Sequence, residues 1–366
     1  MKTKKWSSKW VISKDKIYNN VELIIDKGVI REIKPTRNPE FEYISPMLFD
    51  IHINGGYDSH FTALPSIDTL QDINMASFEQ GTFYSLPTII TSSIENILEG
   101  IRAVKSYIAD HPAKGILGIH IEGPFINPIK RGAHLANYII KPTDSIIDKI
   151  CNEGSDVIKM WTIAPEVFDQ YTLDYIISKG INLSIGHTNA NFGEATLAID
   201  KGIKLVTHLY NAMSPLQHRM PGVVGAALSN EKTYNQIILD GLHCHQAAAQ
   251  IALFGREERT ILVSDALFLG RSKQRFVWEE FDAQLINGSY YNSEGNLAGS
   301  AISQLDAVKY TISNLKIDPI VALKMACINP YLALEIPSNK WDLYKGQHVP
   351  FVAFDKNLNF TYHLPF

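Results

Sequence analysis

The stretch VIKMWTIAPEVFDQYTLDYIISKGINLSIGH (157–187) decides the fold. It begins with an apolar run, Val157–Ile163, continues with a segment of helical period, Leu173–Lys179, and returns to an apolar run, Ile181–Ile185. A strand, a helix and a second strand in this order are typical of parallel β-strands joined by a crossover helix. His187 comes two residues after the second run, so this unit also ends near a side chain that can bind a metal.

The same alternation extends along most of the chain. Six further apolar runs occur at Met47–Ile53, Thr82–Ile90, Gly115–Ile121, Ile203–Val206, Gln236–Leu239 and Thr260–Val263. Helical periodicity marks segments between many runs and two segments after the last: Asp68–Gln80, Ile94–Asp110, Ser145–Asn152, Glu194–Lys201, Gln246–Phe254, Gln304–Leu315 and Pro319–Cys327. Eight nearly continuous apolar runs predict a parallel sheet buried on both faces, closed as a (β/α)8 TIM-like barrel. An open doubly wound sheet is the alternative, but no G-x-G-x-x-G follows the first run.

The two ends of the chain have a different pattern. Short strands are predicted at Lys9–Ile12, Val21–Ile25 and Val29–Ile33, and again in VPFVAFD (349–355) and FTYHLPF (360–366). We expect the ends to pair as one small β-sandwich module made of residues 1–45 and 340–366. The hydrolase barrel would then occupy residues 46–339.

Composition and charge limit the classes of function. The chain has 366 residues, 45% of them apolar and 20% charged, which is the balance of a soluble globular protein. The net charge of −4 and the absence of a basic block argue against nucleic acid and an anionic membrane as partners. The cysteines, Cys151, Cys244 and Cys327, form no C-x-x-C pair, and no signal peptide or membrane span is predicted. These features favour a cytoplasmic protein.

Polar side chains that can bind metals or move protons follow most of the apolar runs. They are Asp50, His52, Asn54, His120, Glu122, His187, His208, Asp240, His243 and Asp265. A single residue of this kind is more often a core or loop residue than a catalytic one. In a barrel, however, the carboxyl ends of all strands lie on one face, where active sites are built. The whole set therefore predicts an active site on that face.

One carboxylate and two imidazoles form the candidate metal site. Glu122, His187 and His208 suit a borderline divalent ion, and they leave a coordination position for water. We expect one such ion per subunit, with zinc as the first choice and iron, cobalt or manganese as alternatives. The set indicates metal-assisted hydrolysis, with Asp265 as the general base and acid. Asp265 could instead cap a following helix, but residues 266–270 are a weak helix start.

Six longer sequence motifs indicate which family the chain resembles. They are HIEGPFINPIKRGAH (120–134), SIGHTNANFGEA (184–195), THLYNAMSPLQHRMPGVVGAAL (207–228), LDGLHC (239–244), VSDA (263–266) and GNLAGSAIS (295–303). Over residues 45–335 the chain resembles the amidohydrolase superfamily, and within it the N-acetylglucosamine-6-phosphate deacetylases. The resemblance implies hydrolysis of the N-acetyl group to give glucosamine-6-phosphate and acetate, with metal-bound water as the nucleophile.

The resemblance also implies roles for individual residues. Glu122, His187 and His208 would hold the metal, while Asp265 and His134 would be catalytic, His134 by polarising the amide. An amino-sugar 6-phosphate would be bound by residues of several loops: Ala133, His134, Asn211, Ala212, Arg219, His243, Leu297, Ala298 and Gly299. The phosphate would be met chiefly by the loops of Asn211, Arg219 and His243, in part across a subunit boundary. A homodimer is therefore implied.

Some features depart from the superfamily pattern. Many amidohydrolases carry H-x-H on the first strand, whereas this chain has His52-Ile53-Asn54. An amide oxygen is a weak ligand for a transition metal, so His52 would support a second ion only weakly or simply form hydrogen bonds. Three alternatives stay open: the galactosamine epimer as substrate, another amidohydrolase reaction, and a catalytically silent relative that binds sugar phosphate.

Overall fold

Eight parallel strands form the centre of the computed structural model, which describes residues 3–112 and 114–365. In order they are β5 (Phe49–Ile53), β6 (Tyr84–Ile90), β7 (Ile119–Glu122), β8 (Ile158–Ile163), β9 (Leu183–Ile185), β10 (Leu205–Val206), β11 (Tyr234–Ile237) and β12 (Thr260–Leu262). Each strand pairs with the next along the chain. The seam closes where Asp265 N–H donates to the carbonyl of His52 (2.8 Å) and Asn54 N–H to that of Ala266 (2.9 Å). The predicted (β/α)8 barrel is confirmed.

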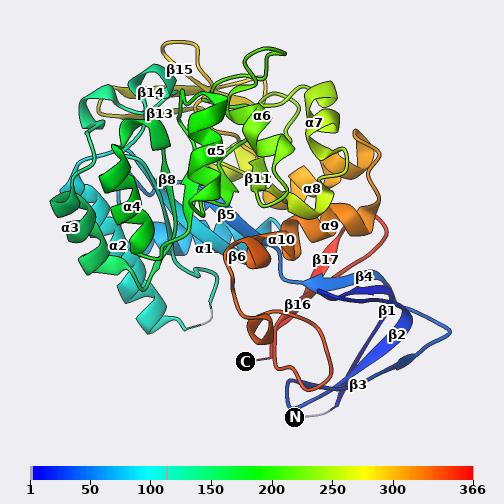
Figure 1. Cartoon of the computed structure of the whole chain (residues 1–366). Helices are drawn as coiled ribbons and strands as arrows, with labels where there is room; N and C mark the ends of the chain where they lie inside the picture. Colours follow the sequence, from blue (N-terminus) through cyan, green and yellow to red (C-terminus); the bar gives the residue numbers. More distant parts are fainter. Residues whose placement is uncertain (1–2, 113, 366) are drawn as a thin grey trace.

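Helices surround these strands, as Figure 1 shows. They are α1 (Ile67–Glu79), α2 (Ile94–Asp110), α3 (Asp144–Gly154), α4 (Gln170–Ser178), α5 (Phe192–Asp200), α6 (Gly222–Ser229), α7 (Gln246–Leu253), α8 (Gln304–Ser313), α9 (Pro319–Cys327) and α10 (Asn329–Ala333). Short 3₁₀ helices lie between them: η1 (Pro128–Lys130), η2 (Ala136–Tyr138), η3 (Pro165–Val167), η4 (Glu257–Arg259), η5 (Leu269–Arg271) and η6 (Ser338–Lys340). The bounds of α2 and α9 equal those predicted. Side-chain caps explain the sharp starts, since Ser93 Oγ accepts from Asn96 N–H at the start of α2.

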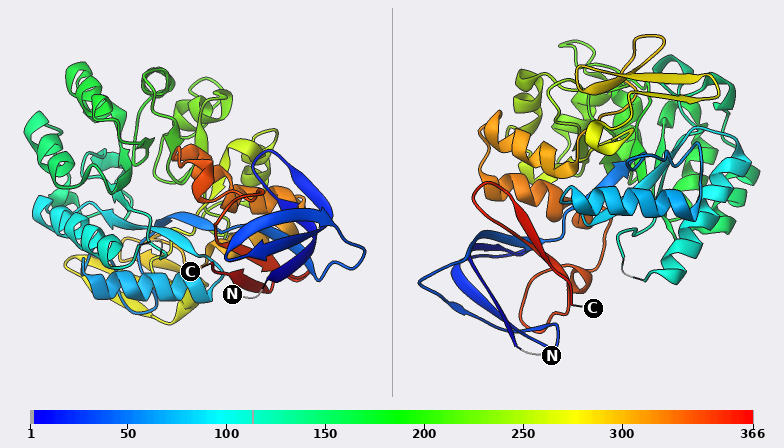
Figure 2. Two further views of the ribbon diagram at one scale, coloured as in Figure 1. Left: turned by 90° about the horizontal axis from the view of Figure 1, so that it is seen from below. Right: turned by 180° about the vertical axis from the view of Figure 1, so that it is seen from behind.

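Strands from both chain ends form a separate six-stranded sheet, in the order β17-β16-β4-β1-β2-β3. Its members are β1 (Lys4–Ile12), β2 (Ile17–Asp26), β3 (Val29–Pro35), β4 (Phe41–Pro46), β16 (Phe351–Phe354) and β17 (Phe360–His363). β4 pairs antiparallel with β16 and thereby joins the two ends. Val11, Leu23 and Phe351 belong to an apolar core separate from the barrel core. Figure 2 shows this module beside the barrel, with both termini in it, which agrees with the expected terminal β module.

A third sheet lies between β12 and α8 and was not predicted. It is antiparallel and consists of β13 (Arg275–Trp278), β14 (Phe281–Ile286) and β15 (Ser289–Asn292). Figure 1 places it over the same side of the barrel as the loops after β7 and β9. Phe268, Phe281 and Tyr290 pack there with Leu135 from the β7 loop. This sheet therefore covers the side of the barrel where the strands end.

Within the described part of the chain, no helix is both long enough and apolar enough to cross a membrane.

Candidate active site

Backbone geometry at the strand ends directs the candidate metal ligands inward. Glu122 is the last residue of β7, and His187 and His208 each lie two residues beyond β9 and β10. Both histidines have positive φ, 47° and 32°, and so does Asp265, with 46°, three residues beyond β12. Positive φ is uncommon for residues other than glycine and concentrates at functional sites. The three turns bring side chains from distant strands to one point.

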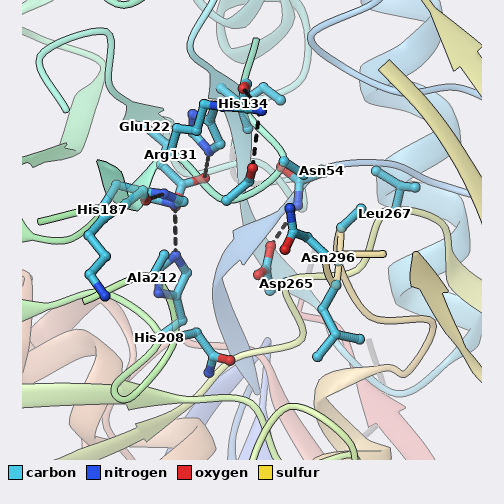
Figure 3. A pocket seen from close by; sticks show the side chains of 18 of the residues that line it. Asn54, Glu122, Arg131, His134, His187, His208, Ala212, Asp265, Leu267 and Asn296 are labelled. Atoms are coloured by element: carbon cyan, nitrogen blue, oxygen red, sulfur yellow. Dashed lines mark hydrogen bonds and ion pairs between the residues drawn. The ribbon is translucent and has the colours of Figure 1, made fainter. Parts of the chain in front are cut away.

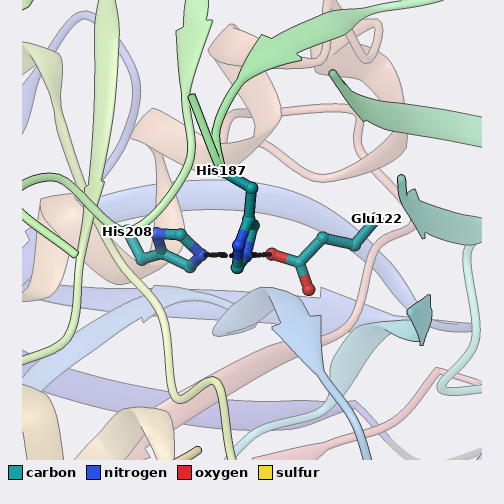
Figure 4. A group of neighbouring side chains, drawn as sticks. All are labelled: Glu122, His187 and His208. Atoms are coloured by element: carbon teal, nitrogen blue, oxygen red, sulfur yellow. Dashed lines mark hydrogen bonds and ion pairs between the residues drawn. The ribbon is translucent and has the colours of Figure 1, made fainter. Parts of the chain in front are cut away.

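The three candidate ligands converge on one another, as Figure 4 shows. His187 Nε2 lies 3.2 Å from Glu122 Oε1, His208 Nε2 lies 3.1 Å from the same oxygen, and the two nitrogens are 3.0 Å apart. Ligands about 2.0–2.1 Å from a tetrahedral zinc ion lie roughly 3.3 Å from one another, so small adjustments would admit one ion. His187 Nδ1–H donates to the carbonyl of Lys130 (3.0 Å), which leaves Nε2 as the ligand atom. The donor set fits a single divalent cation.

Burial and neighbouring groups shift the pKa values of Glu122, His208 and His134. Burial alone would raise the pKa of Glu122, but the neighbouring imidazoles outweigh burial and hold that pKa well below its ordinary value. Burial lowers the pKa of His208. It also lowers the pKa of His134 to about 4, so His134 is neutral at pH 7. A carboxylate beside neutral imidazoles is the form of these ligands that binds a divalent ion.

Asp265 is held from the first strand. Asn54 Nδ2–H donates to Asp265 Oδ1 at 2.8 Å, and His52 Nε2 lies 3.1 Å from the same oxygen. His52 Nε2 is also 3.3 Å from Glu122 Oε2. Figure 3 shows Asn54 and Asp265 facing each other across the cavity from Glu122 and His134. Asn54 therefore orients the candidate base. Asn54 and His52 both lie against Oδ1 of Asp265, and neither contacts Oδ2.

A cavity of about 550 Å³ opens over these groups. Of the thirteen residues to which the resemblance gives a role, twelve line it: Glu122, Ala133, His134, His187, His208, Asn211, Ala212, His243, Asp265, Leu297, Ala298 and Gly299. Thr91 Oγ1 lies 2.8 Å from His134 Nδ1, which fixes the ring of His134 beside the cluster. Arg219 is the exception, because it lines a separate cavity with Phe192 and Met220. The site residues otherwise meet in one place, although their roles stay predictions.

Two strand-end residues lie beneath the cavity and not in it. His120 is hydrogen-bonded inside the barrel, with Nδ1 3.0 Å from Thr88 Oγ1 and Nε2 2.8 Å from Thr162 Oγ1. Asp50 Oδ1 accepts from the backbone N–H groups of His52 and Ser264, both at 3.2 Å. Burial raises the pKa of Asp50 to about 6. Asp50 therefore links the first strand to the end of the eighth, and His120 links the third strand to its two neighbours.

Sequence reasoning did not assign other residues that line the same cavity. Arg131 binds both carboxylate oxygens of Glu294, at 2.5 and 2.7 Å, and also donates to the carbonyl of His134 (2.9 Å). The pair ties the β7 loop to the loop after β15. Arg131 lies within the motif HIEGPFINPIKRGAH (120–134), so the sequence offered a reason to place it near the site. Glu294 and Phe281 belong to the unpredicted sheet region, where the turn Asn287-Gly288 signals a hairpin but not a contact with the cavity.

The comparisons with known proteins agree with this geometry. The amidohydrolase family profile matches residues 43–364. The chain belongs to the amidohydrolase family. A relative from Haemophilus influenzae named N-acetylglucosamine-6-phosphate deacetylase is 28% identical over 341 residues, covering 92% of this chain and 89% of that protein. A relative from Shewanella sp. named N-acetylgalactosamine-6-phosphate deacetylase is 32% identical over 362 residues, covering 94% of this chain and 90% of that protein.

Solved structures show the same architecture over the whole chain. The N-acetylglucosamine-6-phosphate deacetylase of Pasteurella multocida superimposes with a TM-score of 0.89 at 27% identity, covering 99% of this chain and 98% of that one. The Mycobacterium smegmatis protein, solved in complex with N-acetyl-D-glucosamine-6-phosphate, gives a TM-score of 0.90 at 22% identity, covering 100% of this chain and 98% of that one. The second likeness concerns the fold alone.

Proposed function

We propose that this protein is a metal-dependent N-acetylglucosamine-6-phosphate deacetylase. The observation that carries the proposal is the convergence of Glu122, His187 and His208 beside Asp265, in the same cavity as His243 and the loop of Asn211. The first four supply the groups that amide hydrolysis needs, and the others are hydrogen-bond donors for a sugar phosphate. Relatives named for this activity cover most of the chain and support the substrate.

We propose a separate role in amide hydrolysis for the metal ligands, for Asp265 and for His134. A divalent ion held by Glu122, His187 and His208 would polarise the amide carbonyl and make water acidic enough to attack it at neutral pH. Asp265, its Oδ1 held by Asn54 at 2.8 Å, takes the proton from the attacking water and passes it to the leaving nitrogen. His134, held beside the metal ligands by Thr91, polarises the carbonyl as negative charge develops on its oxygen.

One ion per subunit is our proposal for the metal content, with zinc as its identity. Asn54 offers an amide in place of an imidazole, and that amide is hydrogen-bonded to Asp265. His52 Nε2 lies beside Glu122 Oε2 (3.3 Å) and Asp265 Oδ1 (3.1 Å), so it is placed for hydrogen bonds to these carboxylates. We also propose that the protein is cytoplasmic, a location supported by three cysteines that are free and buried.

The position of Arg219 is our reason for proposing a homodimer. Arg219 does not line the site cavity of its own chain, and it lines another cavity with the exposed apolar side chains of Phe192 and Met220, which are 39% and 67% exposed. Exposed apolar patches of this kind mark protein interfaces. We propose that a second copy covers this face and that Arg219 serves the phosphate site of the partner.

Mixed dimers test the sharing of Arg219. A D265N subunit retains Arg219, and an R219A subunit retains Asp265. If Arg219 acts across the interface, the mixed dimer has one complete site and recovers activity that neither homodimer has. Activity no higher than that of the parent variants would place Arg219 in its own subunit or outside the site.

Acetate release tests the main proposal. We expect zinc-loaded protein to release acetate from N-acetylglucosamine-6-phosphate with a higher kcat/KM than from the galactosamine epimer or from the unphosphorylated sugar. A higher kcat/KM for the galactosamine epimer would show that this epimer is the preferred substrate. No release from either phosphorylated sugar, with one metal bound per subunit, would refute deacetylation.

A further inference from the structure

A buried acid–base pair, Asp240 and His243, stands at the edge of the cavity, and Asp240 has no role in the function described above. Asp240 lies three residues beyond the end of β11 and is joined to His243, whose Nδ1 is 2.7 Å from Asp240 Oδ2. The other oxygen of Asp240 accepts from the backbone N–H groups of Leu242 and His243, both at 2.8 Å. The two side chains are 2% and 4% exposed. Three hydrogen bonds therefore fix one short turn.

The turn is built around Gly241. Its φ of +81° is a left-handed conformation that favours glycine. A Cβ there would come within 3.1 Å of the ring of Tyr310 in α8. The backbone can thus fold tightly enough for Asp240 to reach both N–H groups and the imidazole. This turn therefore sets the position of His243.

The geometry also decides which nitrogen of His243 meets the cavity. A carboxylate only accepts hydrogen bonds, so Nδ1 must carry the proton that it donates to Asp240. Nε2 is then the atom left for a ligand. His243 lines the substrate cavity, whereas Asp240 does not and lies on a neighbouring cavity of about 480 Å³ with Arg271 and Tyr310. Asp240 can reach a substrate only through His243.

We propose that Asp240 is a positioning residue that holds His243 with Nε2–H directed at the phosphate of the substrate. This inference rests on the proposed function for the identity of the phosphate. Burial alone would raise the pKa of Asp240, but its contacts with His243 and the two N–H groups lower that pKa, so the carboxylate is charged. The negative charge of the carboxylate lies directly behind the ring, so it supports an Nε2–H that donates to a phosphate oxygen on the other side.

Four variants test the inference: D240N, D240A, H243Q and the double variant D240A/H243Q. Calorimetry with inorganic phosphate and with glucosamine-6-phosphate measures binding without turnover. We expect D240A to weaken phosphate binding by about tenfold or more, and D240N by less because its amide oxygen still accepts one hydrogen bond. In the H243Q background, D240A should add little, since Asp240 acts through His243.

A kinetic readout separates positioning from a structural role. The ratio of kcat/KM for phosphorylated over unphosphorylated N-acetylglucosamine should fall about tenfold in D240A, mainly through KM. An unchanged ratio, with both substrates slowed in parallel, would overturn the inference, as would additive losses in the double variant. If the wild type releases no acetate, the proposed function fails, while the phosphate titrations still decide the role of Asp240.

Discussion

Replacing Asp265 by asparagine separates the proton-transfer group from the metal site. In the structure Asp265 Oδ1 accepts from Asn54 Nδ2 at 2.8 Å. An asparagine can keep this hydrogen bond through its own oxygen, and its amide nitrogen then replaces the free carboxylate oxygen. That nitrogen cannot accept a proton, so general acid–base catalysis is lost. Loss of such a group costs about 10²–10⁴ in rate, which corresponds to roughly 3–5 kcal/mol in the barrier.

The metal should remain bound in this variant. Glu122, His187 and His208 keep their mutual distances of 3.0–3.2 Å, and none of them is changed by D265N. The assay measures acetate release at saturating substrate, together with metal per subunit by mass spectrometry. D169N is a matched control, because Asp169 caps α4 by accepting from Thr172 N–H (2.8 Å) and asparagine caps helices equally well. D265N that retains more than about a tenth of wild-type kcat with full metal would refute the assignment of Asp265.

Three further outcomes are expected. E122Q should lose metal at concentrations that saturate the wild type, because the amide keeps the shape and removes the charge that faces His187 and His208; full metal content in E122Q would contradict the site. D50N should flatten the pH dependence of the unfolding free energy of metal-free protein. The folded pKa of Asp50, about 6, lies above the unfolded value of about 3.9, so Asp50 stabilises the fold below pH 4 and this stability, roughly 3 kcal/mol, is lost as pH rises through 6. Urea titrations from pH 4 to 7 check the slope, and an equal slope in D50N would exclude this role. S303A should cost about 1 kcal/mol, because Ser303 Oγ accepts from Asp306 N–H at the start of α8, whereas S303N should keep most of the cap.

Amphipathic segments with clear caps could be predicted closely from the sequence. α2 begins after Ser93, whose hydroxyl caps it, and carries apolar residues at helical spacing on its buried side, so its bounds follow from local signals. The strands were predicted less closely. The run Gln236–Leu239 corresponds to β11 at Tyr234–Ile237, because Ile238 and Leu239 are buried at the barrel mouth without strand pairing. Buried residues are apolar whether or not they pair in a strand, so an apolar run does not show where the strand ends.

The missed elements include α6 and the sheet β13–β15. α6 is buried over Gly222–Ala227, so it has no polar face to produce a helical period. The hairpin β14–β15 was missed although Asn287-Gly288, both with positive φ, is a typical two-residue hairpin turn; its packing of Phe281 and Tyr290 beside Leu135 has no such local signal. A local window cannot show what an element packs against, so the position of this sheet over the barrel could not be predicted from it.

The sequence by itself determined the kinds of ligand and the order of the strands that carry them. Glu122, His187 and His208 are recognisable as metal-binding types at strand ends. Only the tertiary structure decided that their atoms meet, that Asn54 holds Asp265, and that Arg219 faces away from the cavity of its own chain. Contacts between residues so far apart in the chain exist only when the barrel closes, because closure fixes where each strand ends in space.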